Sequence, residues 1–177
     1  MNDALAAGAE VRVTRTEVVH LSEADLAEIH DLRTRAADFF DEVGDPPPTR
    51  ESFQADLDDL PEGHTRADET IYRAYLRGRP VGYAEVLRGF ARRDQWMIGI
   101  LLVDRAVRGR GIGGAVVGAV EADARAAGAG SLAIGVIASR ERSVAFWRRQ
   151  GFTTEVQRRP FALGDVQTEI VRLERVL

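Results

Sequence analysis

The chain of 177 residues contains no cysteine and no lysine, and it has only three histidines. Without cysteine it can form no disulfide, no thiolate metal site and no covalent intermediate on an enzyme thiol. The histidines are too widely spaced to suggest a shared metal ion, so we expect no metal cofactor. They are His20, His30 and His64.

Long apolar runs are also missing, because no stretch of the sequence is long enough to span a bilayer. The chain begins without the positive charge typical of a signal peptide, which favours a cytoplasmic protein with no membrane partner. Its formal charge of −4 argues against a nucleic-acid partner, since such proteins concentrate basic residues on one face. The length and the 45% apolar content predict a single domain over residues 1–177, with residues 1–9 as a mobile leader.

Negative charge is concentrated in residues 35–62, where nine acids stand against only Arg35 and Arg50. One interpretation is a solvated helical face, which is the usual role of such a run. The other is an acidic rim that attracts a cationic ligand.

Hydrophobic periodicity and turn residues predict strands alternating with helices. Strands are expected at residues 11–19, 70–76, 81–87, 96–103 and 131–137, with two more around Gly164 and Asp165. Helices are expected from Ser22 through Phe40, at residues 53–60, from Ile112 to near Gly128, and at residues 141–150. Short links make the strands at 70–76, 81–87 and 96–103 antiparallel neighbours.

Residues 107–114, of sequence Val-Arg-Gly-Arg-Gly-Ile-Gly-Gly, join a predicted strand to a predicted helix. A glycine-rich turn that opens a helix presents unpaired backbone N–H groups at the positive end of the helix dipole, and this arrangement binds anions. The simplest alternative is a turn that only connects the two elements. A literal match to G-x-G-x-x-G also allows a dinucleotide site in an oxidoreductase.

The context of the loop argues against a nucleotide. A dinucleotide site needs an acid at the tip of the next strand to hold the ribose, but the strand at 131–137 is followed by Ala138, Ser139 and Arg140. A triphosphate loop fails because no Lys-Ser or Lys-Thr pair follows the glycines.

Residues 108–113 resemble the R/Q-x-x-G-x-G/A motif of the GNAT superfamily of N-acetyltransferases, which cradles the pyrophosphate of acetyl-coenzyme A. The preceding run at 101–104 resembles the end of that family's fourth strand. The run Phe-Trp-Arg-Arg-Gln-Gly-Phe at 146–152 resembles its next signature. The likeness is close over about residues 68–155 and extends to the element order of the whole chain.

The resemblance implies an α/β fold with a mixed, mostly antiparallel sheet of about seven strands and about four helices on both faces. It also implies that the fourth and fifth strands splay apart, so that the pantetheine arm of acetyl-CoA lies between them and meets exposed backbone groups of the fourth strand. The coenzyme contacts that we predict on this basis are Leu101, Leu102, Val103, Arg108, Gly109, Arg110, Gly111, Ile112, Gly113, Gly114, Arg140, Ser143 and Trp147.

Three positions depart from the family pattern. Arg140 replaces a frequent asparagine, and it either reaches the coenzyme phosphates or is a solvated arginine at the start of a helix. Ser143 replaces a frequent alanine. Trp147 stands where a tyrosine commonly protonates the leaving thiolate, and an indole N–H cannot act as that acid. Solvent can protonate the thiolate, Tyr83 can substitute for the missing acid, or the protein binds acyl-CoA with little turnover. We favour solvent.

The amine that attacks must lose a proton, so we expect a carboxylate near the strand split. The strand at 96–103 has no acid, which leaves Glu85 as the candidate base. The alternative is that Glu85 faces outward from an alternating strand.

The predicted function is therefore direct acetyl transfer from acetyl-CoA to an amine within a ternary complex. A catalytically weak acyl-CoA-binding module is the alternative, and a dinucleotide-binding oxidoreductase is a remote one. In similar proteins the acceptor is chosen by the first helices and loops, here residues 22–66, whose acidity suggests a cationic small molecule or peptide amine. Similar proteins also often form homodimers, so the resemblance allows a homodimer here and leaves the oligomeric state open.

Overall fold

The computed structural model describes residues 10–43, 46–163 and 166–177. The α-helices are α1 (Glu23–Arg35), α2 (Asp38–Val43), α3 (Arg50–Asp56), α4 (Ile112–Ala126) and α5 (Glu141–Arg149). The strands are β1 (Val11–Glu17), β2 (Glu69–Leu76), β3 (Arg79–Arg88), β4 (Gln95–Val103), β5 (Ser131–Ile137), β6 (Thr154–Leu163) and β7 (Val166–Val176). In the described part of the chain no helix has the length and apolar character needed to cross a bilayer.

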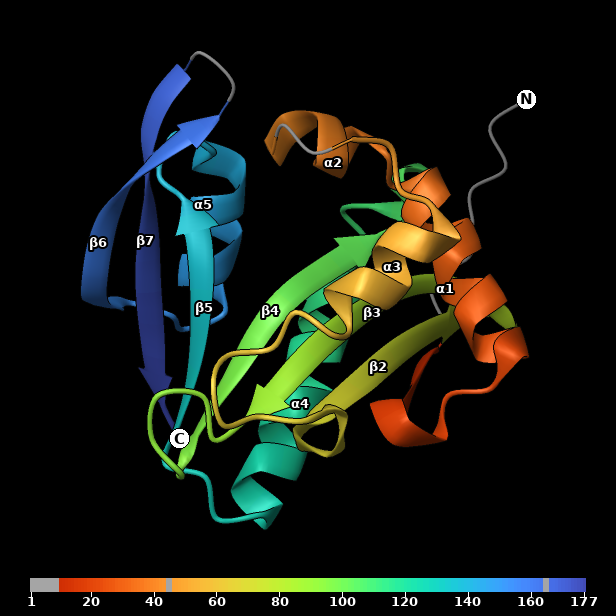
Figure 1. Ribbon diagram of the computed structural model, residues 1–177, viewed down its shortest axis with the longest axis horizontal. Coiled ribbons are helices and arrows are strands. Elements are labelled where there is room, and N and C mark those ends of the chain that lie inside the picture. Colours follow the sequence, from red (N-terminus) through yellow and green to blue (C-terminus); the bar gives the residue numbers. More distant parts are fainter. Residues whose placement is uncertain (1–9, 44–45, 164–165) are drawn as a thin grey trace.

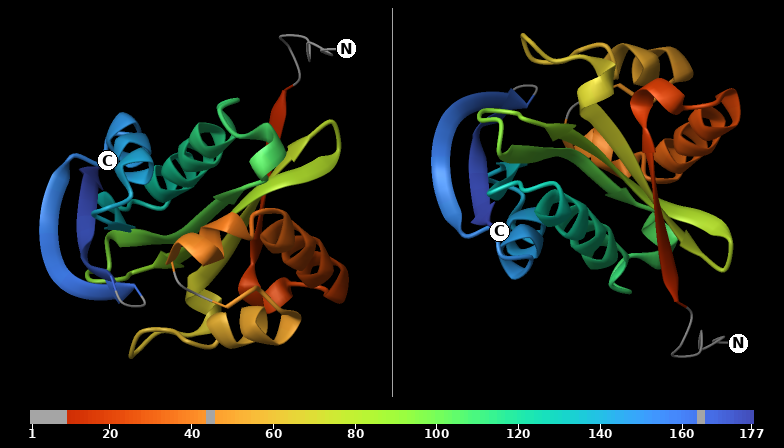
Figure 2. Two further views of the ribbon diagram at one scale, coloured as in Figure 1. Left: turned by 90° about the horizontal axis from the view of Figure 1, so that it is seen from above. Right: turned by 90° about the horizontal axis from the view of Figure 1, so that it is seen from below.

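The seven strands form one sheet in the order β1-β2-β3-β4-β5-β7-β6. Only β4 and β5 pair in parallel, and every other neighbouring pair is antiparallel. Helices α4 and α5 cover one face of the sheet, and α1, α2 and α3 cover the other (Figures 1 and 2). The predicted fold class, with a mixed and mostly antiparallel sheet between helices, is therefore confirmed.

The alternation of side chains along the central strands divides the core between these two faces. In β3, Ala84 and Val86 pack toward α4 together with Val116 and Val120 of that helix. Tyr83 points to the opposite face, where it packs in a second apolar cluster with residues of α1 and α3. Any polar side chain of β3 that lies on the same side as Tyr83 is consequently held beneath α1 and α3.

Local sequence signals explain most helix ends. Ser22 accepts a hydrogen bond from the backbone of Asp25, whose carboxylate accepts one in return, and this capping box begins α1. Thr49 and Ser52 form the same arrangement before α3. Gly128 adopts a positive φ of 77° just beyond α4, as a glycine at that position should.

Several predicted boundaries were wrong. The strand expected to reach residue 19 ends at Glu17, because residues 18–20 form a 3-10 turn. The helix expected to continue through Phe40 stops at Arg35, and Phe40 lies in the separate helix α2. The helix expected at 53–60 ends at Asp56, and there are five described α-helices where about four were expected. The predicted leader at 1–9 and the turn at Gly164 and Asp165 lie outside the described residues.

Candidate active site

The sheet opens at the middle of β4. Parallel pairing between β4 and β5 begins at Gln95 and Ser131 and ends at Ile98 and Ile134, after which the strands diverge (Figure 1). The pairing of β4 with β3, on its other edge, skips one residue at the next position. Glu85 pairs with Ile100, but the following residue of β3 pairs with Ile98. Gly99 is therefore the extra residue of a β-bulge, at the point where the strands part.

Beyond Gly99, the edge of β4 that faces β5 has no strand partner among the described residues. Leu101, Leu102 and Val103 lie on this segment, where the splayed strands of the predicted coenzyme site were expected. The backbone oxygen of Val103 already accepts a hydrogen bond of 2.9 Å from Nε of Arg108. The remaining edge groups stay predicted contacts for the pantetheine amides.

The glycine-rich loop has the conformation of an anion cradle. Gly109 and Gly111 have φ values of 79° and 80°, which residues other than glycine rarely adopt. A Cβ built on either glycine would have no other atom within 4 Å. Gly111 is the N-cap of α4, so the first N–H groups of a 15-residue helix point out of the exposed loop. This conformation is compatible with a bound phosphate, and the role of the loop in coenzyme binding stays a prediction.

Gly113 and Gly114 lie close to α5 and to the residue that follows it. A Cβ on Gly113 would lie 3.1 Å from the Phe146 ring, and one on Gly114 would lie 3.4 Å from Oε1 of Gln150. Both neighbours belong to α5 or its end, so these glycines let α5 approach the start of α4. Their contacts with the coenzyme remain predictions.

The two arginines of the loop are placed differently. Arg108 donates hydrogen bonds to both carboxylate oxygens of Asp38 on α2, at 2.5 and 2.9 Å. Arg110, which is exposed like Arg108, makes no ion pair with a described residue. The hydrogen bond from Arg108 lowers the pKa of Asp38 below its ordinary value. A phosphate would have to compete with Asp38 for Arg108, so Arg110 is the more accessible of the two predicted phosphate contacts.

Replacing Gly111 with alanine is expected to weaken coenzyme binding. The left-handed backbone at this position costs a residue with a Cβ about 1–3 kcal/mol, so the dissociation constant of acetyl-CoA should rise about 5- to 150-fold. Gly118 provides a matched control, because it lies within α4, has no positive φ and has open space around it. Isothermal titration should show unchanged binding for Gly118→Ala, and equal binding by both variants would refute the cradle.

The remaining predicted coenzyme residues lie on or beside α5. Arg140 is the N-cap of this helix, three residues after the end of β5, and the half-buried Ser143 lies in its first turn. Trp147 is only 8% exposed, and its ring packs edge-on against Phe146 and Phe152. The indole therefore serves the packing of α5 on the sheet, in agreement with its inability to supply a proton.

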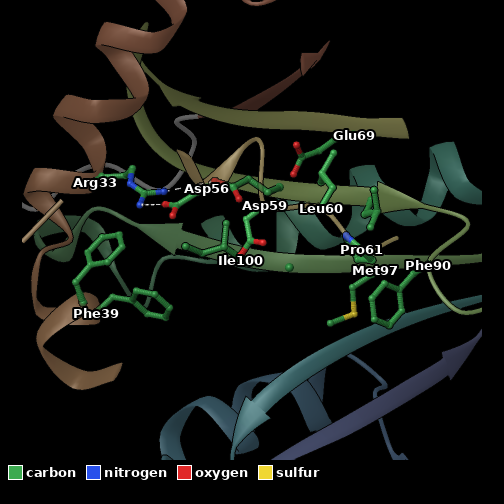
Figure 3. Close-up of a pocket in the computed structure, with 14 residues that line it drawn as sticks. Arg33, Phe39, Asp56, Asp59, Leu60, Pro61, Glu69, Phe90, Met97 and Ile100 are labelled. Carbon is green, nitrogen blue, oxygen red and sulfur yellow. Dashed lines mark hydrogen bonds and ion pairs between the residues drawn. The ribbon is translucent and has the colours of Figure 1, made fainter. Parts of the chain in front are cut away.

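A pocket of about 350 Å³ lies on the opposite side of the β4 bulge from the glycine loop, beneath α1, α2 and α3 (Figure 3). Its floor includes Gly99 and Ile100, the two residues at the bulge. Its charged lining consists of four carboxylates and one guanidinium, which belong to Asp56, Asp59, Glu69, Glu85 and Arg33. Its apolar lining is formed by Phe39, Phe40, Leu60, Pro61, Leu87, Phe90 and Met97.

Arg33 organises the polar end of the pocket although its side chain is only 4% exposed. It donates to a carboxylate oxygen of Asp56 at 2.5 Å, which Figure 3 shows, and to the hydroxyl of Tyr83 at 3.0 Å. Its guanidinium also lies over the rings of Phe40 and Phe53. These hydrogen bonds and ring contacts fix the position of the Arg33 guanidinium.

Glu85 lies at the bottom of the pocket, with its side chain 14% exposed and Oε1 3.6 Å from Nη1 of Arg33. Burial raises the pKa of this carboxyl to about 7, although the nearby Arg33 cation opposes the rise. A carboxylate that titrates near neutral pH is suited to accept a proton there. The structure thus places Glu85 inside the pocket rather than on an outward face.

Tyr83, the predicted candidate acid, lies in the core between the sheet and the helices α1 and α3. Its ring packs edge-on against Phe53, and burial raises the pKa of its hydroxyl well above the usual value. A phenol with a raised pKa is a weaker proton donor, so the environment favours solvent as the source of the proton.

Sequence reasoning missed Arg33, Glu69 and the bulge at Gly99. Arg33 follows Ile29 by four residues and therefore lies on the apolar stripe of α1, a signal that could have identified a buried cation. Glu69 is 6% exposed and lines the pocket from the start of β2. The bulge left no signal other than a glycine within a strand.

Residues 26–152 match the model of the acetyltransferase (GNAT) family. A search of curated proteins found no significant match to the sequence. Among solved structures, the chain resembles the ribosomal-protein-S18-alanine N-acetyltransferase of Escherichia coli, with a TM-score of 0.69, 17% identity and coverage of 93% of this chain and 94% of that one.

Two further solved structures resemble the chain equally well. The ribosomal-protein-alanine N-acetyltransferase of Brucella melitensis has a TM-score of 0.69 at 22% identity, with coverage of 95% and 99% of the two chains. An N-acetyltransferase of Staphylococcus aureus has a TM-score of 0.70 at 19% identity, with coverage of 94% and 98%. At such identities these likenesses establish the shared fold.

Proposed function

Because the chain belongs to the GNAT family of acetyltransferases, we propose that it transfers an acetyl group from acetyl-CoA to an amine by direct attack in a ternary complex. One observation carries the proposal. The strand split that would hold the coenzyme arm and the pocket that contains Glu85 meet at the bulged residue Gly99. An acetyl group and an amine bound on the two sides of this bulge would be neighbours.

In this proposal the co-substrate acetyl-CoA supplies the activated acetyl group. The backbone N–H groups between Gly109 and the start of α4 bind its pyrophosphate, and Arg110 adds positive charge. The splayed edge of β4 pairs with its pantetheine arm. Backbone N–H groups at the bulge hydrogen-bond the thioester oxygen and stabilise the negative charge that develops on it.

The acceptor amine binds on the pocket side and transfers a proton to Glu85, directly or through water. The neutral nitrogen then attacks the acetyl carbon, and the new C–N bond forms as the C–S bond breaks. The nitrogen, which carries a positive charge after the attack, releases its extra proton to water and becomes the amide. The coenzyme leaves as a thiolate that takes a proton from solvent. Arg33 positions Glu85 by lying 3.6 Å from its carboxylate.

The charge of the pocket supports the expectation of a cationic acceptor, since four carboxylates face one guanidinium that is already paired with Asp56. A protonated amine would be attracted to such a pocket, whereas a carboxylate-bearing acceptor would be repelled.

A coenzyme A release assay with acetyl-CoA and a panel of cationic, neutral and acidic amines tests the proposal. We expect release to depend on the amine and to be fastest for cationic acceptors. Coenzyme A, but not NAD, should raise the melting temperature by mass action. Tight coenzyme binding without acceleration by any amine would instead support an acyl-CoA-binding module.

A further inference from the structure

The pocket contains a second buried carboxylate that the proposed reaction does not use. Glu69 is 6% exposed, and among the described residues its Oε2 atom has no hydrogen-bond partner. It lies beside Leu60, while Arg33 and Phe39 lie at the opposite end of the pocket (Figure 3). A buried carboxylate oxygen without a partner is costly unless a ligand supplies one.

Strand register fixes the position of Glu69 relative to Glu85. Ile71 pairs with Glu85 and Glu69 pairs with Leu87, so the two glutamates are diagonal neighbours on adjacent antiparallel strands. Residues two apart in a strand share a face, and both carboxylates accordingly line the same pocket. Diagonal positions of this kind are about 7–8 Å apart.

The surroundings of Glu69 favour a cation over other ligands. Burial raises the pKa of its carboxyl to about 7, the charge of Glu85 adds to the rise, and Arg66 opposes it. Arg66 itself is paired with Asp58, at 2.7 Å through its Nε atom. The adjacent wall is apolar, with Leu60, Phe90 and Met97, which suits a methylene chain.

We propose that the acceptor is a diamine, with its reacting nitrogen at Glu85 beside the bulge and its second, ammonium nitrogen bound by Glu69. This inference rests on the proposed acetyl transfer and deepens it by naming the substrate class and a specificity residue. The spacing of about 7–8 Å between the two strand positions corresponds to a chain of about four to six carbons between the nitrogens. Glu69 recognises the nitrogen that is not acetylated and takes no part in the chemical step.

The first test compares kcat/KM for 1,4-diaminobutane and n-pentylamine. The two molecules are equally long, but the diamine ends in a second ammonium group where n-pentylamine ends in a methyl group. The wild-type protein should prefer the diamine by about 10- to 100-fold, the value of a hydrogen bond to a charged group. A series of diamines with three to eight carbons should show an optimum at four to six carbons. This series needs no variant, so it remains informative even if substitutions at Glu69 impair folding.

The second test uses Glu69→Gln, which keeps the shape of the side chain and removes its charge. The preference for the diamine over the monoamine should fall to near one, and the ratio cancels any general loss of activity. Glu69→Asp, which keeps the charge on a shorter side chain, should restore a preference and move the optimum to longer diamines. Glu10→Gln is the control, since Glu10 is exposed, lies outside residues 22–66 and should leave the ratio unchanged.

An unchanged ratio in Glu69→Gln, or a wild-type protein that acetylates both amines equally well, would overturn the diamine proposal while leaving acetyl transfer intact. A protein that acetylates no amine would overturn the proposed function itself. The two failures are therefore distinguishable in one set of measurements.

Discussion

Replacing Glu85 with glutamine is expected to lower kcat by about 10²- to 10⁴-fold, the usual contribution of a general base. The variant keeps the size of the side chain but cannot accept the proton of the amine. Steady-state rates of coenzyme A release at saturating substrates measure the effect. Glu23→Gln is a matched control, because Glu23 is exposed in the first turn of α1.

The pH dependence of the rate provides a second readout of the same prediction. Since burial raises the pKa of Glu85 to about 7, the carboxyl is protonated below that pH and cannot act as a base. The wild-type rate should therefore rise with pH through about 7, and Glu85→Gln should lose this limb. A variant that retains both the rate and the limb would show that another group, or water alone, accepts the proton.

Replacing Arg33 with alanine is expected to lower the free energy of unfolding by about 3–5 kcal/mol, the usual cost of breaking a buried ion pair. The substitution removes the partner of Asp56 and Tyr83 and leaves Glu85 buried without its neighbouring cation. Urea denaturation monitored by circular dichroism measures the loss. A difference below about 1 kcal/mol would be in the range of exposed ion pairs and would contradict the role assigned to Arg33.

The loss of unfolding free energy in Arg33→Ala should also depend on pH. Arg33 lowers the pKa of Glu85, so its removal should raise that pKa further above the value in the unfolded chain. A carboxyl whose pKa is higher in the folded state favours folding at low pH, and the benefit is lost as the pH rises through the folded value. The deficit of Arg33→Ala should accordingly be larger at pH 8 than at pH 5. Arg125→Ala, which breaks an exposed ion pair with Glu121, should show little deficit at either pH.

The glycine loop, α4 and β5 could be predicted from the sequence because their signals are local. Closely spaced glycines, an apolar stripe of period 3.6 and a short apolar run each determine structure within a few residues. The resemblance of residues 108–113 to a coenzyme motif then indicated the family, which the family match confirms. The same match removes the dinucleotide-binding oxidoreductase as an alternative.

The acceptor side could not be predicted in the same way, because it depends on contacts between distant segments. Arg33 and Glu85 are 52 positions apart, and only the packing of α1 on β3 brings them together. The ion pair between Arg108 and Asp38 joins segments 70 positions apart, so Arg108 was assigned to the coenzyme alone. The bulge at Gly99 depends on the register between β3 and β4, for which a glycine within the strand is the one local signal. The cytoplasmic location and the homodimer remain predictions.

The most direct test of the central claim is a two-substrate initial-rate study in which coenzyme A and the acetylated amine are measured in the same reaction. The claim is that acetyl-CoA and the amine bind on the two sides of Gly99 and react there directly. It predicts equal amounts of the two products and intersecting lines in double-reciprocal plots. Parallel lines, or release of coenzyme A without acetylated amine, would contradict it.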